Sequence, residues 1–226
     1  MHAFSFAGRT LHALPERALW WPDRRAILVA DMHLEKASWF AATSGQMLPP
    51  FDSDDTLMRL TRLVEHYRPA EIWALGDSFH DSAGPTRLSD DIRGQLARLA
   101  TGRRFVWITG NHDEAAAMPG ERLSEAEIDG VVLRHETQPG DPRPEISGHF
   151  HPKLRLHAAT RGVSRPCFAG SPNRLILPAF GAFTGGLDVT DPALAAPLGP
   201  EAFALVPTRS KLLLFPLADT GRRHRA

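Results

Sequence analysis

Residues 26–33 read AILVADMH, an unbroken apolar run that ends in an aspartate and a histidine. The same arrangement occurs twice more, because residues 72–80 read IWALGDSFH and residues 105–113 read FVWITGNHD. Short apolar runs bounded by glycine and polar residues are typical of strands buried on both faces. The three stretches therefore predict three buried strands, each followed at once by side chains that can bind metal ions.

Two amphipathic segments separate these strands. Over residues 54–67, apolar residues recur at helical spacing after Ser53, which is expected to cap the helix. The same pattern covers residues 90–100, where Ser89 is the expected cap. This half of the chain therefore alternates strand and helix, which is the order that produces a parallel sheet.

Elsewhere the pattern is mainly that of strands. Residues 11–21 and 26–30 predict a hairpin with its turn at residues 22–23. Further strands are predicted over residues 131–135, 145–147, 166–169, 175–177 and 212–215, with Pro-rich loops at 140–144 and 192–200. We expect an α/β fold in which two sheets form a β-sandwich flanked by helices. We expect one domain over residues 1–226, with the basic tail 218–226 disordered.

The composition excludes several classes of protein. The 226 residues are 42% hydrophobic and 23% charged, which argues against a disordered or coiled-coil protein. Lys and Arg number 26, as do Asp and Glu, so the overall charge does not indicate a nucleic-acid partner. Cys167 is the single cysteine, so an intrachain disulfide is excluded and a reducing cytoplasmic location is favoured. We expect Cys167 to be buried. No apolar run has the length of a membrane span.

Residues of metal-binding types follow five of the predicted strands. In chain order these motifs are Asp31-Met32-His33, Gly76-Asp77-Ser78-Phe79-His80, Gly110-Asn111-His112-Asp113, His135 and Gly148-His149-Phe150-His151. Each motif alone has an ordinary structural explanation, such as a turn or a surface strand. Because the carboxyl ends of neighbouring parallel strands meet at one edge of a sheet, the series predicts a single metal site at that edge.

The series of motifs resembles that of the calcineurin-like metallophosphoesterase superfamily. Longer stretches resemble its bacterial ligase-associated branch, namely VADMHLEKASWF at residues 29–40, ISGHFHP at 146–152 and PCFAGSPNRLILPAFGAFTGGLDV at 166–189. The resemblance spans roughly residues 6–217. It implies a four-layer α/β/β/α arrangement and the activity of that branch, which consists of Mn-dependent phosphodiesterases from DNA-repair gene clusters.

Carried over by position, the resemblance implies two divalent metal ions. The ligands implied for the first ion are Asp31, His33, Asp77 and His151. The ligands implied for the second ion are Asp77, Asn111, His135 and His149. Mixed imidazole and oxygen ligands favour Mn, with Fe or Zn as alternatives, over Mg or Ca. Asp77 is able to bridge the two ions because a carboxylate has two oxygens.

The resemblance also implies the catalytic residues. Two cations would hold the phosphoryl group and activate a water molecule for in-line attack. His112 would protonate the leaving oxygen, and Asp113 would orient its imidazole. The alternative is that His112 is a further metal ligand.

The resulting prediction is a dinuclear metal-dependent phosphodiesterase, a nuclease or nucleotide diesterase linked to DNA repair. It implies DNA or RNA as substrate, functional association with the DNA ligase, helicase and exonuclease of a repair cluster, and no membrane partner. A small-molecule phosphatase or cyclic-nucleotide phosphodiesterase is the first alternative. A non-catalytic metal-binding scaffold is the second, and the presence of all the ligand positions argues against it.

Charge is distributed unevenly along the chain. Residues 31–91 contain 11 acidic and 5 basic residues, whereas residues 143–174 contain six basic residues and one acidic residue. The basic segment flanks His149 and His151, so it predicts a surface for a polyanion, with a solvated sheet face as the alternative. The segment has no interleaved aromatic residues of the kind that stack on bases.

Several residues near the motifs allow two interpretations. His80 lies either beside the metals or at the surface. Glu35 stands where the branch usually has glycine, and we expect it to be a solvated charge. Lys36 either meets a phosphate or is simply exposed. The glycines within residues 181–186 form either an anion-binding turn or a tight turn before a strand over residues 187–189.

Overall fold

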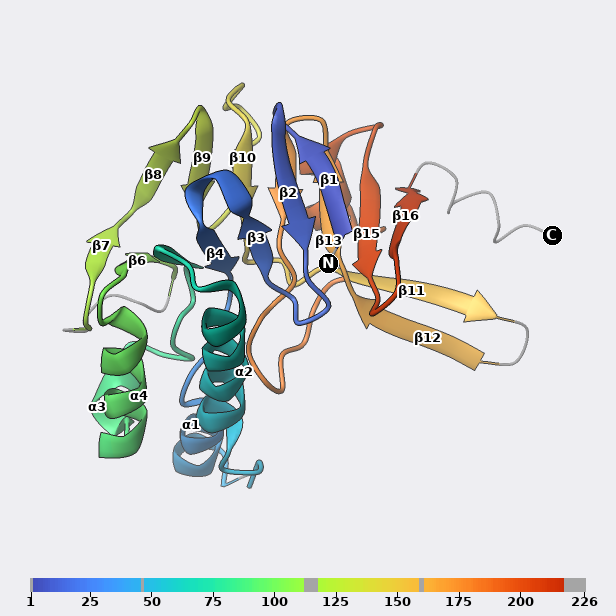
Figure 1. Cartoon of the computed structure of the whole chain (residues 1–226). Helices are drawn as coiled ribbons and strands as arrows, with labels where there is room; N and C mark the ends of the chain where they lie inside the picture. The colour runs from blue at the N-terminus through green and yellow to red at the C-terminus, as the bar shows by residue number, and fades with distance from the viewer. Residues whose placement is uncertain (1, 46, 112–117, 159–160, 218–226) are drawn as a thin grey trace.

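Two seven-stranded mixed sheets pack face to face in the computed structural model, with helices on the outer side of each sheet (Figure 1). The structure describes residues 2–45, 47–111, 118–158 and 161–217. The predicted catalytic residues His112 and Asp113 lie outside these ranges, as does the tail 218–226 that we expect to be disordered.

The first sheet contains the strands that the sequence predicts around the metal motifs. Its order is β1 (His2–Phe6), β2 (Arg9–Ala13), β3 (Leu19–Trp21), β4 (Ala26–Val29), β5 (Glu71–Leu75), β6 (Arg104–Ile108) and β7 (Glu121–Leu123). The four strands from β4 to β7 are parallel, and β1 to β4 are antiparallel.

The predicted strand over residues 11–21 is wrong, because the chain reverses within it. β2 and β3 are joined by a turn in which Leu14 N donates to Ala18 O at 2.9 Å, and Arg17 adopts the left-handed conformation with φ +69°. The expected turn at residues 22–23 is a single turn of 3₁₀ helix, η1 (Pro22–Arg24).

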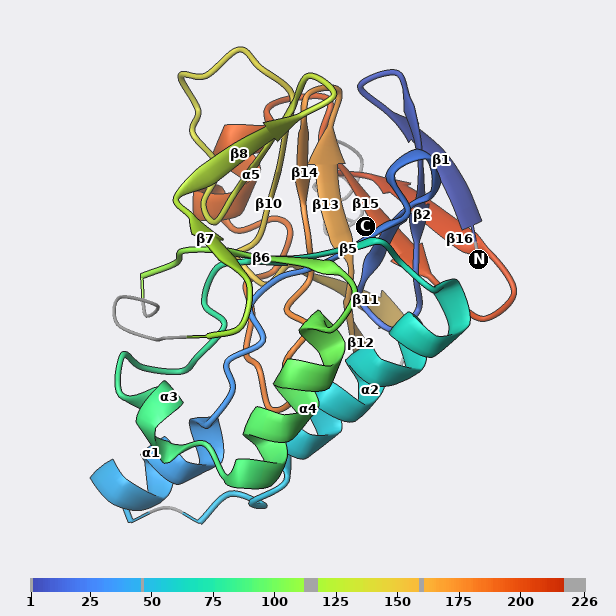
Figure 2. The same cartoon turned by 60° about the vertical axis from the view of Figure 1, so that its left-hand side comes forward.

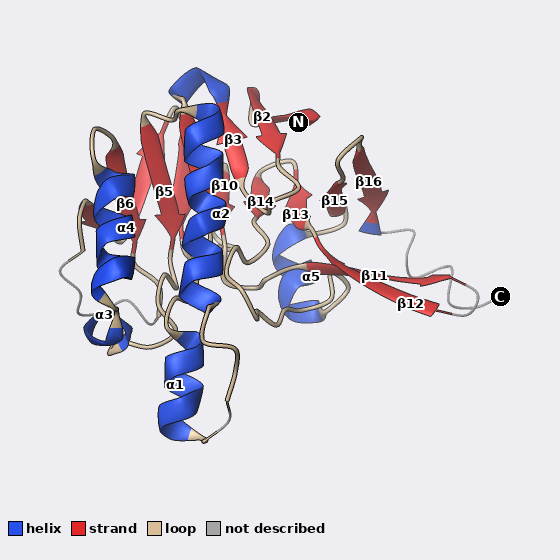
Figure 3. Cartoon of the chain, turned by 60° about the horizontal axis from the view of Figure 1, so that its bottom comes forward, coloured by secondary structure: helices blue, strands red, loops and turns tan. Residues whose placement is uncertain are grey.

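Helices α1 (Lys36–Thr43), α2 (Asp52–Tyr67), α3 (Gly84–Arg87) and α4 (Asp90–Ala100) lie on the outer side of the first sheet, with α2 and α4 side by side (Figures 2 and 3). The cap of α4 is confirmed, since Ser89 Oγ accepts from Ile92 N at 3.3 Å. The cap predicted for α2 is wrong. That helix begins at Asp52, and Ser53 Oγ instead accepts from Glu35 N at 2.9 Å, because the first turn of α2 packs beneath the start of α1.

The second sheet holds the strands of the later part of the chain. Its order is β16 (Leu212–Pro216), β15 (Phe203–Pro207), β13 (Phe168–Ser171), β14 (Arg174–Ile176), β10 (Glu145–Ser147), β9 (Val131–Arg134) and β8 (Glu125–Ile128). Residues 192–200, predicted as a loop, contain α5 (Pro192–Leu198). Asp191 caps this helix by accepting from Ala193 N at 2.9 Å, and a proline at the first helical position suits its start. The strand expected over residues 187–189 is only a single bridge between Lys153 and Asp188.

A two-stranded hairpin that the sequence analysis does not predict projects from this body (Figures 1 and 3). It consists of β11 (Lys153–Ala158) and β12 (Arg161–Pro166), which form a sheet of two strands, with the bridge from Lys153 to Asp188 at its base. Its first residues follow His151 directly, so the hairpin begins beside a predicted metal ligand.

Three apolar layers hold the four structural layers together. One lies between the helices and the first sheet, the second between the two sheets, and the third between the second sheet and α5. This confirms the predicted sandwich flanked by helices. Cys167 is buried in the third layer, and its burial raises the pKa of its thiol to about 12. In the part of the chain that the structure describes, no helix has the length and apolar character needed to cross a membrane.

A buried ion cluster ties the strands of the second sheet together next to His135. Glu145 Oε1 accepts from Arg174 Nε at 3.1 Å, and its Oε2 lies 3.5 Å from Arg134 Nε. All three side chains are buried, and Thr137 Oγ1 also donates to Glu145. We expect Glu145→Ala to lower the free energy of unfolding by about 3–5 kcal/mol, because two buried guanidinium groups lose a counter-charge. Urea denaturation measures this loss.

Glu121→Ala is the matched control, since Glu121 pairs with Arg104 at the exposed edge of the first sheet. Water solvates both of these groups, so this substitution is expected to change stability little. Similar losses of stability in the two variants would contradict the role given to the buried cluster.

Candidate metal centre

The predicted ligands converge at the carboxyl ends of strands from both sheets. Asp31 and His33 follow β4, and Asp77 follows β5. His135 follows β9, while His149 and His151 follow β10. Because the sheets pack face to face, these strand ends meet, and the six side chains form two groups of three.

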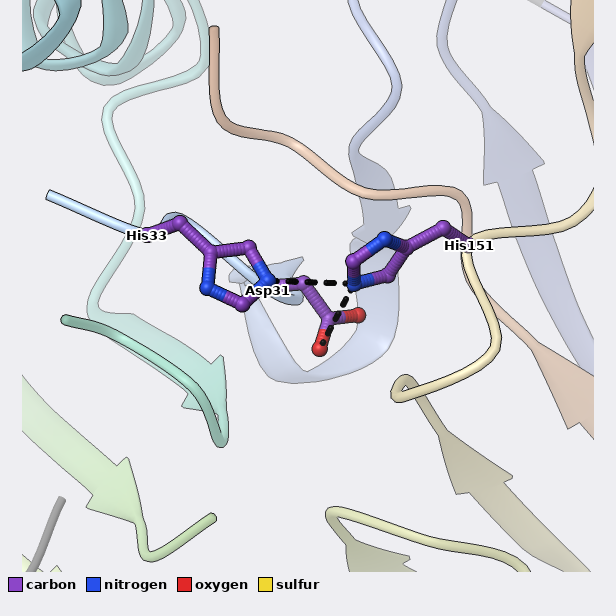
Figure 4. Close-up of side chains that lie close together, drawn as sticks. All are labelled: Asp31, His33 and His151. Carbon is purple, nitrogen blue, oxygen red and sulfur yellow. Dashed lines mark hydrogen bonds and ion pairs between the residues drawn. The ribbon is translucent and has the colours of Figure 1, made fainter. Parts of the chain in front are cut away.

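The first group consists of Asp31, His33 and His151, whose ligand atoms all lie within 4.8 Å of one another. The Nε2 atoms of His33 and His151 are 3.1 Å apart, and His151 Nε2 is 3.5 Å from Asp31 Oδ1. Figure 4 shows the Nε2 atoms of the two imidazole rings pointing toward each other beside the Asp31 carboxylate. Donor atoms about 3 Å apart fit around one ion, since metal–nitrogen bonds are about 2.1 Å long.

The second group consists of Asp77, His135 and His149, whose ligand atoms also all lie within 4.8 Å of one another. His149 Nδ1 lies 3.0 Å from His135 Nε2, which is 3.5 Å from Asp77 Oδ1. The other ring nitrogen of His135, Nδ1, lies 3.2 Å from the Leu75 carbonyl. That carbonyl accepts from Nδ1–H and leaves the lone pair of Nε2 facing the group, as in histidines that bind metals. A backbone carbonyl has no sequence signal, so the sequence analysis could not have found Leu75.

Asp31 connects the two groups. Its carboxylate accepts from the backbone N–H of His149, with distances of 3.1 Å to Oδ1 and 2.9 Å to Oδ2. His135 Nδ1 lies 3.9 Å from Asp31 Oδ1. The two groups are therefore neighbours within one site, as the sequence predicts.

The environment of Asp77 tests whether these residues fit a metal. Its Oδ1 is buried and has no hydrogen-bond partner among the described residues. A buried carboxylate oxygen without a partner is unfavourable unless a cation neutralises it. The imidazole and carboxylate donors around it are those that Mn, Fe and Zn accept. The residues present therefore fit a pair of divalent ions.

The backbone of the site is strained. Five of the predicted ligands have left-handed φ angles between 43° and 71°, namely Asp31, His33, Asp77, His149 and His151. Residues other than glycine seldom adopt this conformation, and such strain concentrates at functional sites. It points the side chains of consecutive motif residues into one space.

Two glycines make the close approach possible. A Cβ atom at Gly148 would lie 2.5 Å from Asp31 Oδ2, and one at Gly110 would lie 2.5 Å from Asp77 Oδ1. The motifs therefore need glycine at these positions. Asn111 follows Gly110 directly and is exposed, and its role as a ligand stays a prediction.

The structure decides between the interpretations of two neighbouring residues. The His80 ring packs edge-on against His33, with 5.7 Å between ring centroids, and against Trp39 at 4.7 Å, so His80 lies beside the first group. The expectation of a solvated Glu35 is wrong. Its side chain is buried and accepts from Ser53 Oγ at 3.0 Å, because the start of α1 folds over α2.

The buried Asp77 oxygen, which has no hydrogen-bond partner among the described residues, leads to a prediction about stability. We expect Asp77→Asn to raise the free energy of unfolding of the metal-free protein by about 1–3 kcal/mol, because the substitution removes an unpartnered buried charge. Asparagine also tolerates the left-handed φ of +45° at this position. In the same variant, the rise in melting temperature on adding Mn²⁺ should be lost. Thermal and urea unfolding with and without Mn²⁺ measure both effects.

Asp23→Asn provides the control, since Asp23 is exposed in η1 at the opposite ends of the strands. It should leave unchanged both the free energy of unfolding of the metal-free protein and the rise in melting temperature on adding Mn²⁺. If Asp77→Asn destabilises the metal-free protein and retains the full Mn²⁺ response, Asp77 does not contribute to a metal site.

Comparisons with known proteins give one family and two similar solved structures. The model of the calcineurin-like phosphoesterase family matches residues 24–156. The crystal structure of Pseudomonas putida nuclease MPE is similar at 30% identity and a TM-score of 0.73, covering 96% of this chain and 99% of that chain. A conserved uncharacterized protein (predicted phosphoesterase) from Streptococcus pneumoniae TIGR4 is 18% identical, covers 72% of this chain and 76% of that one, and has a TM-score of 0.33. No curated protein matches the sequence.

The family match covers more than half of the chain and includes both halves of the site. Asp31 and His33 lie near its beginning, and His149 and His151 lie near its end. Members of this family use a dinuclear divalent metal centre, for which the two groups of three residues are the candidate sites. The chain therefore belongs to the calcineurin-like phosphoesterase family and is a phosphoester hydrolase.

Proposed function

We propose that the protein is a dinuclear metal-dependent phosphodiesterase that cleaves a nucleic acid or a nucleotide diester. The observation that carries this proposal is the pair of adjacent three-residue groups connected through Asp31. The likeness to Pseudomonas putida nuclease MPE, at 30% identity over 96% of this chain, supports the choice of a diester over a monoester substrate.

The proposal assigns the metal ligands as follows. One ion is held by Asp31, His33 and His151, with Asp77 shared between the ions. The other is held by Asp77, His135 and His149, with Asn111 completing the set. The donor types favour Mn, with Fe or Zn as alternatives. When bound, the ions supply Lewis-acid stabilisation of the phosphoryl oxygens and a nucleophilic water near neutral pH.

The chain's own residues supply the rest of the chemistry. Asp31 and Asp77 are the two ligand carboxylates, so two divalent ions leave the site with a positive charge that attracts a phosphodiester. The Leu75 carbonyl orients the His135 ring so that its Nε2 faces the second group. His112 protonates the leaving oxygen, and Asp113 orients its imidazole, which are the roles that the motif resemblance supports.

We also assign the enzyme to DNA repair in the cytoplasm, acting beside a DNA ligase, helicase and exonuclease. The support is the resemblance of residues 166–189 to the ligase-associated branch.

Metal-stripped protein should hydrolyse an aryl phosphodiester when Mn²⁺ is added back and should hydrolyse the matching aryl monoester much more slowly. The rates of nitrophenol release with single added metals measure both reactions. A preference for the monoester would favour the small-molecule phosphatase. Tight metal binding without hydrolysis of either ester would favour a binding protein.

His112→Ala should lower kcat by about 10²–10⁴-fold for a substrate with a poor leaving group, because such a leaving group needs a proton. The loss should be smaller for the aryl diester, whose phenolate leaves readily. Comparing kcat for an oligonucleotide and an aryl diester at saturating Mn²⁺ measures the difference.

His12→Ala is the matched control, since His12 lies on β2, two strands from β4, and pairs with Trp20. It should leave both rates unchanged. Equal losses on the two substrates in His112→Ala, accompanied by weaker Mn²⁺ binding, would instead make His112 a metal ligand.

A further inference from the structure

Helices α2 and α4 run in the same direction along the outer side of the first sheet. Each lies in a connection from the carboxyl end of one parallel strand to the amino end of the next, which fixes this common direction. Their inner faces pack on the sheet through residues such as Leu57, Leu60 and Leu96. In Figure 3 the two helices stand in front of the sheet, and none of the other labelled elements covers them. Their outer faces are therefore exposed to contact with another molecule.

The outer face of α2 carries an acid, an apolar residue and a base at equal spacing. Asp54, Met58 and Arg62 follow one another at four-residue intervals, which places them on one side of the helix. Met58 has 43% of its surface exposed, and Asp54 and Arg62 lie about 6 Å to either side of it along the helix axis.

The two charges on this face are oriented by neutral groups. Asp54 Oδ1 accepts from Gln95 Nε2 at 3.3 Å, and Arg62 Nη2 donates to Met58 Sδ at 3.2 Å. Among the residues that the structure describes, neither Asp54 nor Arg62 forms an ion pair. Both charges are therefore available to a molecule that brings groups of the opposite sign.

The outer face of α4 repeats this pattern around a glycine. Asp91 and Arg98 are exposed on the same side of the helix as Gly94, which lies between them. A Cβ atom at Gly94 would have the flexible end of Arg98 as its nearest neighbour, at 3.3 Å, so packing within the chain does not require glycine. Glycine also stabilises a helix less than alanine does. The missing side chain is explained if a second helix approaches α4 closely at this point.

A groove of about 630 Å³ lies between the two helices. Its lining includes the apolar residues Met58, Val64 and Leu99. Asp54 lines it toward the amino ends of the helices, and Arg98 lines it toward their carboxyl ends. The face thus has a negative end and a positive end with apolar surface between them. Such a face is complementary to itself when a second copy is turned end over end.

The helix dipole does not account for the whole arrangement. Acids in the first turn and bases in the last turn stabilise any helix, which explains Asp55 and Asp90. Arg62, in contrast, lies in the interior of α2, and Glu65 lies closer to its carboxyl end, where the dipole favours a base. The position of Arg62 is instead explained by an acid outside the chain.

We propose that the outer faces of α2 and α4 form the interface of a symmetric dimer of this chain. The two-fold axis lies in the interface and crosses the two helices at Met58 and Gly94, so that each helix packs antiparallel on the same helix of the second copy. The strands reverse together with the helices, which places the two metal centres at opposite ends of the dimer. The inference does not depend on the reaction that those centres catalyse.

Antiparallel packing brings opposite charges together on both helices. Asp54 faces the partner's Arg62, and Asp91 faces the partner's Arg98. The symmetry repeats each pair, so the interface has four ion pairs around an apolar centre. These pairs fix the antiparallel orientation, because parallel packing would place like charges opposite each other.

Sedimentation velocity of the full chain over a series of protein concentrations measures the dissociation constant of the dimer. The wild type should be a dimer whose dissociation constant rises with salt concentration. Arg62→Glu should raise that constant at least about tenfold, because two glutamates then face two aspartates. Asp54→Arg should do the same. The double variant Asp54→Arg/Arg62→Glu should recover the wild-type constant, since both pairs return with their signs exchanged.

Gly94→Gln separates an interface role from a structural one. It should weaken the dimer, because two side chains fill the space between the α4 helices. At a concentration where the protein is monomeric it should raise the melting temperature, because glutamine favours the helix. A dimer as tight as that of the wild type would contradict the placement of the axis at Gly94.

Arg209→Glu is the matched control for reversal of charge. Arg209 is exposed in the turn between β15 and β16 of the second sheet, away from α2 and α4. It should leave the dissociation constant unchanged, and thermal unfolding shows that each variant is folded. If Arg209→Glu weakens the dimer as much as Arg62→Glu does, only overall charge matters and the interface is wrong.

Two further outcomes would overturn the proposal. If the wild type is monomeric at every concentration, a second copy is the wrong occupant of this face. If it is a dimer that Arg62→Glu and Asp54→Arg leave intact, the two copies associate through another surface.

Discussion

The hydrogen bond from the His149 backbone to the Asp31 carboxylate is the contact on which the site depends. It joins the loop after β10 in the second sheet to the loop after β4 in the first, with distances of 3.1 and 2.9 Å to the two carboxylate oxygens. Gly148 permits it, because any side chain there would occupy the space of Asp31 Oδ2. The contact places the backbone of His149, in the second group, against Asp31, in the first.

The site is assembled at a cost to the stability of the metal-free chain. Asp77 has a buried oxygen without a described partner, and five ligand residues have left-handed backbones. The apolar layers on both sides of the first sheet and the buried cluster around Glu145 offset this cost. Stability and function are thus divided spatially, since the strands supply packing and the loops after them hold the strained, charged groups.

The loop at residues 180–184 is hydrogen-bonded to the end of the strand that carries Asp31. Its amides are bound at Ala30 and Asp31, while its carbonyls anchor cations from α2, the β2–β3 turn and β11. The loop backbone is therefore fixed relative to Ala30 and Asp31, and it provides one carbonyl to each of the three cations.

Local pattern was enough to predict the elements and ligands that depend on neighbouring residues. Periodicity predicts the bounds of α4 and β10, and the motifs placed directly after apolar strands predict the candidate ligands after β4, β5, β9 and β10. Tertiary packing decided the rest. Ser53 binds Glu35 instead of capping α2, and residues 11–21 form two strands because the chain reverses between them. The anchoring of Arg59 at Phe180 joins positions 121 residues apart, and that of Arg17 at Gly181 joins positions 164 apart. Contacts at such separations have no periodic signature, because they arise only when the two sheets and α2 pack together.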